Sequence, residues 1–310
     1  MSDTPADGGS VAVSVCVCTR RRPEGLKKLL ESLAAATEPP GGMEIIVVEN
    51  DEAAQTRSAV DSAISRFSHV PVGYFVEPRQ NIALARNLSV AKARGAWLAF
   101  IDDDEVASKG WIVNLLSTAL EYRVTGVFGP VVPEYPPGTP RWARETRLYE
   151  RPRHTTGSRV PPGHLRTSNA MISRSALLAV PGPFDPRFGR SGGEDFFLFS
   201  KLHEDGCTFL WCDDADVTES VGRGRLTLMD MTRRSFGAGQ VYARAVALRR
   251  GKATLVGNAF RGVGGIGVGV LVGLPLLAFR RGAGVRWLLK AAAGMGKISA
   301  LLPGHYPRYR

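Results

Sequence analysis

The segment Trp97-Leu98-Ala99-Phe100-Ile101-Asp102-Asp103-Asp104-Glu105 decides the fold of this 310-residue chain. Its apolar run ends abruptly in four consecutive acids, which is the pattern of a buried strand followed by a polar loop. Four carboxylates at one strand end repel one another, so we expect a cationic group beside them. Asp102 and Asp104 would point to the same side of an extended segment. Two hard oxygen ligands on one side suit Mg²⁺ or Mn²⁺ holding a diphosphate, and a solvated acidic turn is the alternative.

The first third of the chain repeats an order of strand, helix and strand. Strands are predicted at residues 11–17, 44–48, 74–76 and 97–101, and helices from residue 24 and over residues 81–93. This order is typical of an α/β fold with a mostly parallel central sheet flanked by helices. In such sheets ligands bind beyond the carboxyl ends of the strands. Polar clusters at residues 19–22, 49–52 and 102–105 follow three strand ends, so we expect them to line one crevice.

The middle of the chain is less regular. The sequence predicts strands at residues 127–132 and 168–172 and a helix over residues 194–203. Between the two strands, residues 133–163 are rich in Pro, Arg and Gly, which indicates a long loop or lid.

Charged residues outside the acidic segment offer further chemistry. Glu194 and Asp195 follow the flexible pair Gly192-Gly193, and a carboxylate there is a candidate general base, although acids in a first helical turn also stabilise helices. Arginine suits phosphate because its planar fork donates paired hydrogen bonds. Candidate phosphate ligands are therefore Arg86, Arg223 and Arg225, with solvated surface charge as the alternative. No role is predicted for His154, His164 or His203.

The composition limits the partners and the compartment. A net charge of +11 favours an anionic partner: nucleic acid, a phosphorylated substrate or an anionic membrane surface. Nucleic acid is the weakest choice, because zinc-finger, RNA-binding and zipper patterns are lacking. The four cysteines show neither zinc spacing nor disulfide density, and the first ten residues lack the apolar core of a signal peptide. We expect a cytoplasmic protein that contacts the inner face of the membrane.

The C-terminal part differs in composition from the rest. Residues 262–279 carry no charge, lie between Arg261 and the pair Arg280-Arg281, and have the minimum length for a membrane span. Residues 285–302 mix apolar and basic residues, as interfacial helices do. We expect membrane contact here, and a glycine-rich packing helix is the alternative. The predicted division is a disordered segment 1–10, a catalytic domain 11–240 with halves 11–130 and 131–240, and a basic helical tail 241–310.

Five segments taken in order resemble family 2 glycosyltransferases of the GT-A fold, and most of all the succinoglycan-type exopolysaccharide glucosyltransferases. The segments are residues 15–23, 46–52, 79–87, 99–105 and 192–195, and the resemblance covers about residues 11–225. It implies inverting transfer of a sugar from a nucleoside-diphosphate sugar, usually UDP-linked, to a hydroxyl of a glycan or of a polyprenyl-linked acceptor. It also implies a divalent metal, Mn²⁺ or Mg²⁺.

The resemblance assigns roles to particular residues. Asp102 and Asp104 would be the D-x-D pair, with Asp104 the more direct metal ligand, and Asp103 would face the ribose or the sugar. Asp195 would be the catalytic base, and Glu194 would help to bind the acceptor. The nucleoside pocket would be lined by Thr19, Arg21, Glu49 and Asp51. The family commonly has Asp where this chain has Glu49, so the base that is recognised stays open.

Two other readings remain at this point. A nucleotidyltransferase shares the parallel sheet and the acidic metal site, but it would want a glycine-rich loop with a lysine after the first strand. Residues 19–22, Thr-Arg-Arg-Arg, stand there instead. A non-catalytic protein that keeps the fold without turnover is the other alternative.

Overall fold

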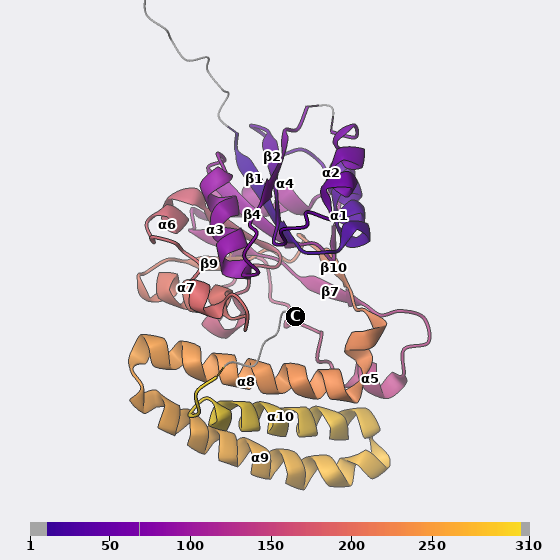
Figure 1. Cartoon of the computed structure of the whole chain (residues 1–310), viewed down its shortest axis with the longest axis vertical. Coiled ribbons are helices and arrows are strands. Elements are labelled where there is room, and N and C mark those ends of the chain that lie inside the picture. The colour runs from indigo at the N-terminus through magenta and orange to yellow at the C-terminus, as the bar shows by residue number, and fades with distance from the viewer. Residues whose placement is uncertain (1–10, 68, 305–310) are drawn as a thin grey trace, which may run out of the picture.

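The computed structural model describes residues 11–67 and 69–304, so the predicted disorder of residues 1–10 falls outside the described residues. The chain folds around a seven-stranded sheet of order β3-β2-β1-β4-β8-β6-β9 (Figure 1). All neighbouring strands are parallel except where β8 pairs with β4 and β6. The strands are β1 (Val13–Thr19), β2 (Met43–Glu49), β3 (Val72–Val76), β4 (Trp97–Asp102), β6 (Gly126–Phe128), β8 (Ala170–Ser173) and β9 (Phe209–Trp211). The predicted α/β fold with a mostly parallel sheet is confirmed.

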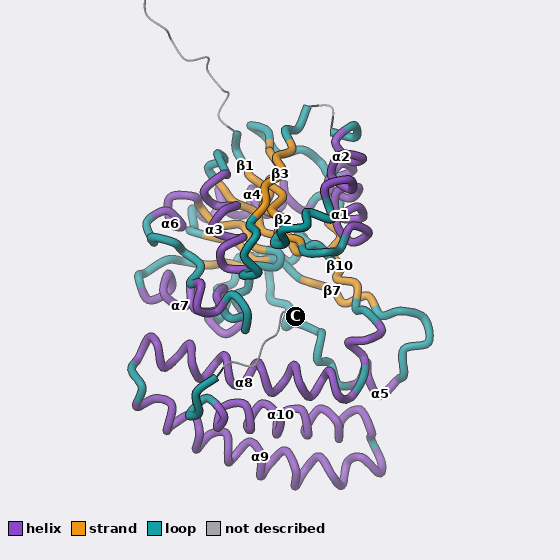
Figure 2. Tube along the Cα trace, viewed as in Figure 1, coloured by secondary structure: helices purple, strands orange, loops and turns teal. Residues whose placement is uncertain are grey.

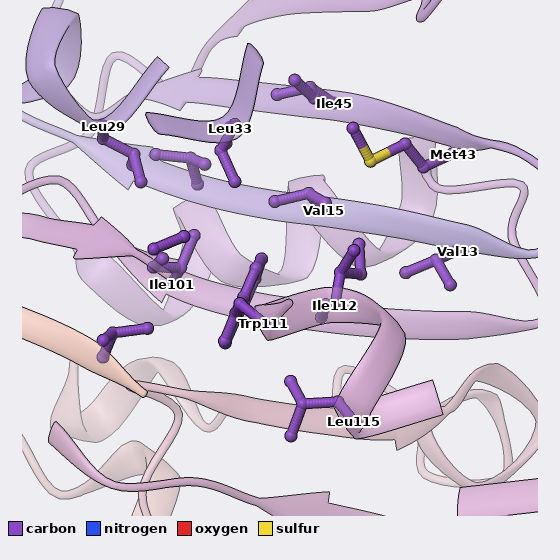
Figure 3. Close-up of a cluster of buried hydrophobic side chains, with 14 of the residues drawn as sticks. Val13, Val15, Leu29, Leu33, Met43, Ile45, Ile101, Trp111, Ile112 and Leu115 are labelled. Atoms are coloured by element: carbon purple, nitrogen blue, oxygen red, sulfur yellow. The ribbon is translucent and has the colours of Figure 1, made fainter. Parts of the chain in front are cut away.

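Helices cover both faces of this sheet because its strands are apolar on both sides. On one face, α1 (Pro23–Ala35), α2 (Arg57–Ile64) and α4 (Trp111–Tyr122) pack against alternate residues of β1, β2 and β4. On the other face lie α3 (Ile82–Lys92), α6 (Arg174–Leu178) and α7 (Glu194–Glu204). Figure 3 shows the first cluster, in which the labelled side chains are Val13, Val15, Leu29, Leu33, Met43, Ile45, Ile101, Trp111, Ile112 and Leu115.

A second, three-stranded sheet lies beside the first. It has the order β5-β10-β7, with β5 (Glu105–Ala107) antiparallel to β10 (Val217–Ser220) and β7 (Val131–Glu134) parallel to it. The prediction of a single strand over residues 127–132 is wrong, because this segment forms two strands, β6 and β7, that belong to different sheets. The break falls at Gly129-Pro130: a Cβ on Gly129 would lie 2.5 Å from the carbonyl oxygen of Ala215, and proline has no N–H for a strand ladder.

In the predicted long loop, the first two residues belong to β7, and the rest contains only short helices. Residues 133–163 carry α5 (Arg141–Glu145) and lead into η1 (Pro162–His164), and η2 (Pro186–Phe188) precedes α7. The helices α2 and α4 and the strands β5, β9 and β10 were not predicted. A tryptophan, Trp111, anchors α4 by donating its indole N–H to Asn169 Oδ1 over 2.7 Å.

The C-terminal part forms a layer of three long helices at one end of the molecule. The helices are α8 (Leu228–Arg250), α9 (Ala253–Phe279) and α10 (Arg281–Ser299), and the short η3 (Arg223–Leu226) connects α8 to β10. Figures 1 and 2 show α8 nearest the sheet and α9 farthest from it. The strand β1 runs toward this layer, so the carboxyl ends of the parallel strands face it (Figure 1). The helix α8 is continuous across residue 241, where the tail was expected to begin.

Candidate active site

The acidic segment after β4 meets the basic segment after β1. Thr19 donates a hydrogen bond from Oγ1 to Asp103 Oδ2 over 2.8 Å. The Nη1 atom of Arg22 lies 2.9 Å from Asp103 Oδ1 and 3.1 Å from Asp104 Oδ2. Because β1 and β4 are parallel neighbours, their carboxyl ends come together, as the sequence predicted. Arg22 belongs to the cluster of residues 19–22 that was expected at this crevice, although no individual role was predicted for it.

The residues after β2 face the same basic segment. Arg21 Nε donates to Asp51 Oδ2 over 2.6 Å, and Arg20 Nε lies 3.4 Å from the same oxygen. A hydrogen bond from the Ala53 backbone N–H and the pairing with Arg21 hold the pKa of Asp51 below its usual range. Arg21 has a φ of 55°, in the left-handed region, which turns the chain sharply at the strand end. Arg21 and Asp51 thus lie at the edge where the nucleoside pocket was predicted.

Glu49 was predicted to line the same pocket as Arg21 and Asp51, but its side chain has a different set of partners. Its carboxylate is fully buried and accepts hydrogen bonds from the backbone N–H of Arg21 (3.2 Å) and of Thr56 (3.0 Å), from the Thr56 hydroxyl, and from the Tyr74 hydroxyl (3.4 Å). These donors come from the turn after β1, from the segment before α2 and from β3. Glu49 therefore fixes the backbone around the predicted pocket through Arg21 and Thr56.

Arg86 on α3 joins the two halves of the site. Asn81 sets the start of this helix by accepting hydrogen bonds from the backbone N–H groups of Ala83 and Leu84 at 3.1 and 3.2 Å. The Arg86 guanidinium is buried, pairs with Glu194 through Nη1, and lies 3.4 Å from Asp102 Oδ1 through Nη2. A planar fork can bind two carboxylates at once, so Arg86 ties the end of β4 to the start of α7.

Asp195 lies next to this ion pair, in the first turn of α7. Gly192 and Gly193 precede the helix with φ values of 78° and 100°. A Cβ on Gly193 would lie 2.2 Å from Val241 Cγ1, so only glycine fits between α7 and α8. Asp195 is half-buried and its Oδ1 accepts the Phe196 backbone N–H over 2.6 Å, whereas Glu194 is buried against Arg86. The structure thus brings Glu194 and Asp195 to the same edge as Asp102.

Three carboxyl groups of the acidic segment have raised pKa values. Burial, together with the charges of Asp102, Glu219 and Asp103, raises the pKa of Asp104 to about 6. Burial also raises the pKa of Asp103, and it raises that of Glu105 well above its usual range. A cation beside these carboxylates would relieve this cost.

The donor set suits a divalent metal with open positions. The side chains of Asp102 and Asp104 are 40% and 23% exposed, so their oxygens are accessible. Within residues 11–67 and 69–304, no group of three or more His, Cys, Asp or Glu side chains is arranged to hold a metal. Two carboxylates that leave the other positions to a diphosphate and water are what Mg²⁺ and Mn²⁺ commonly accept.

One of the two predicted arginines from the Gly-Arg-Gly-Arg stretch reaches the acids. Arg225 Nη1 lies 3.4 Å from Asp104 Oδ2, and its Nη2 lies 2.7 Å from Glu219 Oε1. Arg223 is exposed and donates to the Pro137 carbonyl over 3.2 Å instead. Glu219 was missed, because the strand β10 that sets it opposite Glu105 was not predicted.

His154, His164 and His203, three of the five histidines in the sequence, lie outside these contacts. His154 and His164 stack on each other, with 3.0 Å between Nε2 and Nδ1, and His203 is exposed on α7.

Comparison with known proteins identifies the family of this chain. Residues 14–179 match the sequence profile described as Glycosyl transferase family 2. The succinoglycan biosynthesis protein ExoM of Rhizobium meliloti (strain 1021) is 35% identical over 239 residues, which cover 76% of this chain and 75% of that protein. These matches bear out the resemblance seen in the five sequence segments.

Solved structures with the same fold are more distant in sequence. The mannosyltransferase PcManGT of Pyrobaculum calidifontis, in complex with GDP-Man and Mn²⁺, superposes with a TM-score of 0.64 at 16% identity, covering 94% of this chain and 87% of that one. S. aureus TarS 1–349, in complex with UDP-GlcNAc, gives a TM-score of 0.53 at 14% identity, covering 95% and 93%. At such low sequence identity, these superpositions show a shared GT-A fold and nothing more specific. By its sequence match and its fold, the chain belongs to glycosyl transferase family 2 and is a glycosyltransferase.

Proposed function

We propose that this glycosyltransferase moves a sugar from a UDP-linked donor to a hydroxyl of a glycan or polyprenyl-linked acceptor, with inversion and with Mn²⁺ or Mg²⁺. The observation that carries the proposal is the position of Arg86, whose guanidinium contacts both Asp102 and Glu194. This contact joins the acids proposed for the donor to the carboxylates proposed for the acceptor. A donor and an acceptor can therefore meet at one edge of the sheet.

The donor side is assigned to the ends of β1, β2 and β4. Thr19, Arg21 and Asp51 line the nucleoside pocket, Glu49 shapes it from beneath, and Asp103 faces the ribose or the sugar. Asp102 and Asp104 hold the metal, with Asp104 as the more direct ligand. When bound, the metal stabilises the negative charge that develops on the leaving diphosphate. Arg22 and Arg225 pair with Asp104 in the structure, and they lie where they can exchange this carboxylate for diphosphate oxygens.

The acceptor side is assigned to the start of α7. Asp195 removes the proton of the acceptor hydroxyl as its oxygen attacks the anomeric carbon from the face opposite the diphosphate. The bond from that carbon to the diphosphate oxygen breaks, and the nucleoside diphosphate leaves. One displacement inverts the configuration. Glu194, held by Arg86, positions Asp195 and the edge that meets the acceptor.

The relatives favour these assignments. PcManGT was solved with a nucleotide sugar and Mn²⁺, and ExoM is a succinoglycan biosynthesis protein. We therefore place this chain in exopolysaccharide synthesis, in the cytoplasm at the inner face of the cell membrane. Residues 11–130 would bind the donor, residues 131–240 the acceptor, and residues 241–310 the membrane.

Incubation with UDP-sugars and Mn²⁺ tests the proposal. We expect release of UDP that depends on both the metal and the acceptor, and a product of inverted configuration. Release of pyrophosphate from a nucleoside triphosphate would instead show a nucleotidyltransferase. Absence of turnover with every nucleotide sugar that raises the melting temperature would leave only binding.

A further inference from the structure

The outer surface of the helical layer has a chemistry unlike the rest of the molecule. We infer that α9 lies in the plane of an anionic lipid bilayer, with its apolar outer face inserted, and that it does not cross the membrane. This inference deepens the membrane contact of the proposed function, but it does not depend on glycosyl transfer.

The two faces of α9 are reversed with respect to a helix in water. Large apolar side chains project outward: Phe260 is 74% exposed and Leu271 is 76% exposed. Val256, Val263, Val270 and Leu274 are also exposed, and their spacing places all six on one side of the helix. The buried residues of α9 are Asn258, Gly262, Gly269 and Gly273, which share the opposite side. A helix that hides glycine and exposes Phe and Leu is suited to an apolar surrounding on its outer face.

The inner face of α9 is sealed against α10 along its length. A Cβ on Gly262 would lie 2.6 Å from the Gly294 carbonyl oxygen, and one on Gly269 would lie 2.7 Å from that of Trp287. The same construction seals α10 against α8, since a Cβ on Gly296 would lie 1.9 Å from the Phe236 carbonyl oxygen. The three backbones therefore pack closely, and α9 is held parallel to the layer.

The connections of α9 argue against a crossing. Only Gly251 and Lys252 separate α8 from α9, and only Arg280 separates α9 from α10. If α9 crossed, α10 would either stay on the far side or return through the bilayer with Arg286, Lys290 and Lys297. Among the described residues, α9 is the one helix long and apolar enough to span. Both alternatives would break the packing of α10 on α8, whereas insertion of the outer face leaves it intact.

The charge of the tail selects an anionic surface. Residues 228–310 contain fourteen Lys and Arg and a single acid, Asp230, whereas residues 1–227 contain 26 basic and 28 acidic residues. The positive excess of the chain is therefore confined to the part that carries α9. Such a segment is attracted to anionic lipid, and it repels a second copy of itself.

Vesicle flotation tests the apolar face. We expect the protein to float with phosphatidylcholine vesicles that contain about 30% phosphatidylglycerol. With vesicles of pure phosphatidylcholine it should stay at the bottom of the density gradient. The double variant F260D/L271D should bind at least about tenfold more weakly, because it puts two charges on the inserted face. The matched control L120D/L178D changes two exposed leucines on α4 and α6 and should float as the unchanged protein does. Equal flotation of F260D/L271D would overturn the inference.

Two more measurements fix the geometry and separate this inference from the catalytic one. A protease site and tag added at the C-terminus should be digested when protein is bound to the outside of vesicles, and so should a protease site placed at Gly251-Lys252 or at Arg280, whereas protection of any of these sites would show a crossing. F260D/L271D should keep the UDP and Mn²⁺ affinity of the unchanged protein, so a loss of flotation alone concerns the membrane. A dimer in vesicle-free solution that F260D/L271D dissociates would assign the face to a second copy instead.

Discussion

Two carboxylates at opposite ends of the central sheet, Glu44 and Asp104, have pKa values shifted in opposite directions. At the amino end, Glu44 on β2 accepts hydrogen bonds from Ser14 Oγ (2.7 Å), the Arg94 backbone N–H (2.7 Å) and Arg94 Nε (2.9 Å). Burial alone would raise its pKa, but these donors hold the pKa of Glu44 below its usual range. At the carboxyl end, burial and neighbouring acids raise the pKa of Asp104 to about 6, although Arg22 and Arg225 lie beside it.

This difference separates stability from function. Glu44 has the donors it needs within the protein, so its charge stabilises the fold. At Asp104, burial and the neighbouring acids outweigh the two arginines beside it, so its negative charge is costly and a bound cation would stabilise it. Unfavourable charge that is retained in a folded protein is typical of functional sites.

The largest effect is expected from Asp195→Asn. Asparagine keeps the size of the side chain but cannot take a proton from the acceptor, so kcat should fall by about a thousandfold. Titration calorimetry should show an unchanged affinity for UDP and Mn²⁺. The matched control Asp205→Asn changes an exposed acid beyond the other end of α7 and should keep full activity. Lost donor affinity in Asp195→Asn would contradict its assignment as the base.

Arg86→Met tests the bridge between the two halves of the site. Removing one partner of a buried ion pair leaves Glu194 uncompensated, which should lower the free energy of unfolding by about 3 to 5 kcal/mol. Urea denaturation measures this change. Lys201→Met breaks the half-exposed pair with Asp205 on the same helix and should cost less than about 0.5 kcal/mol. If the two variants lost equal free energy of unfolding, the buried pair of Arg86 and Glu194 would stabilise the protein no more than an exposed pair does.

Asp104→Asn separates the two roles at the carboxyl end. The loss of a metal ligand should weaken Mn²⁺-dependent UDP binding by about a hundredfold, whereas binding without metal should change little. Because burial and the neighbouring acids make the charge that is removed costly, the melting temperature of the free protein should stay the same or rise. Asp61→Asn, at an exposed acid on α2, serves as the control. A lowered melting temperature with unchanged binding would show that Asp104 stabilises the fold and does not bind the metal.

The smallest effect is expected from Glu44→Gln, at the amino end of the central sheet. A folded-state pKa below the ordinary value means that the charge of Glu44 stabilises the fold above about pH 4.5, and that this stability is lost as the pH falls through the lowered pKa. We expect the variant to be less stable by about 1 to 2 kcal/mol at pH 7. The gap between the two proteins should close toward pH 3, with activity per folded molecule unchanged. A gap that widens as the pH falls would show the opposite sign.

The sequence predicted the elements whose signal is local. The strands β1, β2 and β4 are continuous apolar runs that end in charged residues, and α3 begins at Asn81, whose side chain caps it. Their parallel pairing brings Thr19, Asp103 and Asp104 together without further information. The succession of strand ends therefore sufficed to predict the edge of the sheet at which the acids gather.

The remaining features depend on contacts between distant segments. The three residues of β5 and four of β10 carry no periodicity long enough to read, so the register that sets Glu219 opposite Glu105 was not predictable. Likewise, Arg86 pairs with Glu194 across more than a hundred residues of chain. The reversed faces of α9 become visible only when α10 covers its glycines.

A crystal soaked with UDP and Mn²⁺ tests the central claim most directly. We expect an anomalous manganese peak in contact with Asp104 and Asp102, with both phosphates of UDP on the metal and the uridine beside Arg21 and Asp51. A nucleotide bound elsewhere, with those two aspartates still paired only to Arg22, Arg86 and Arg225, would contradict it.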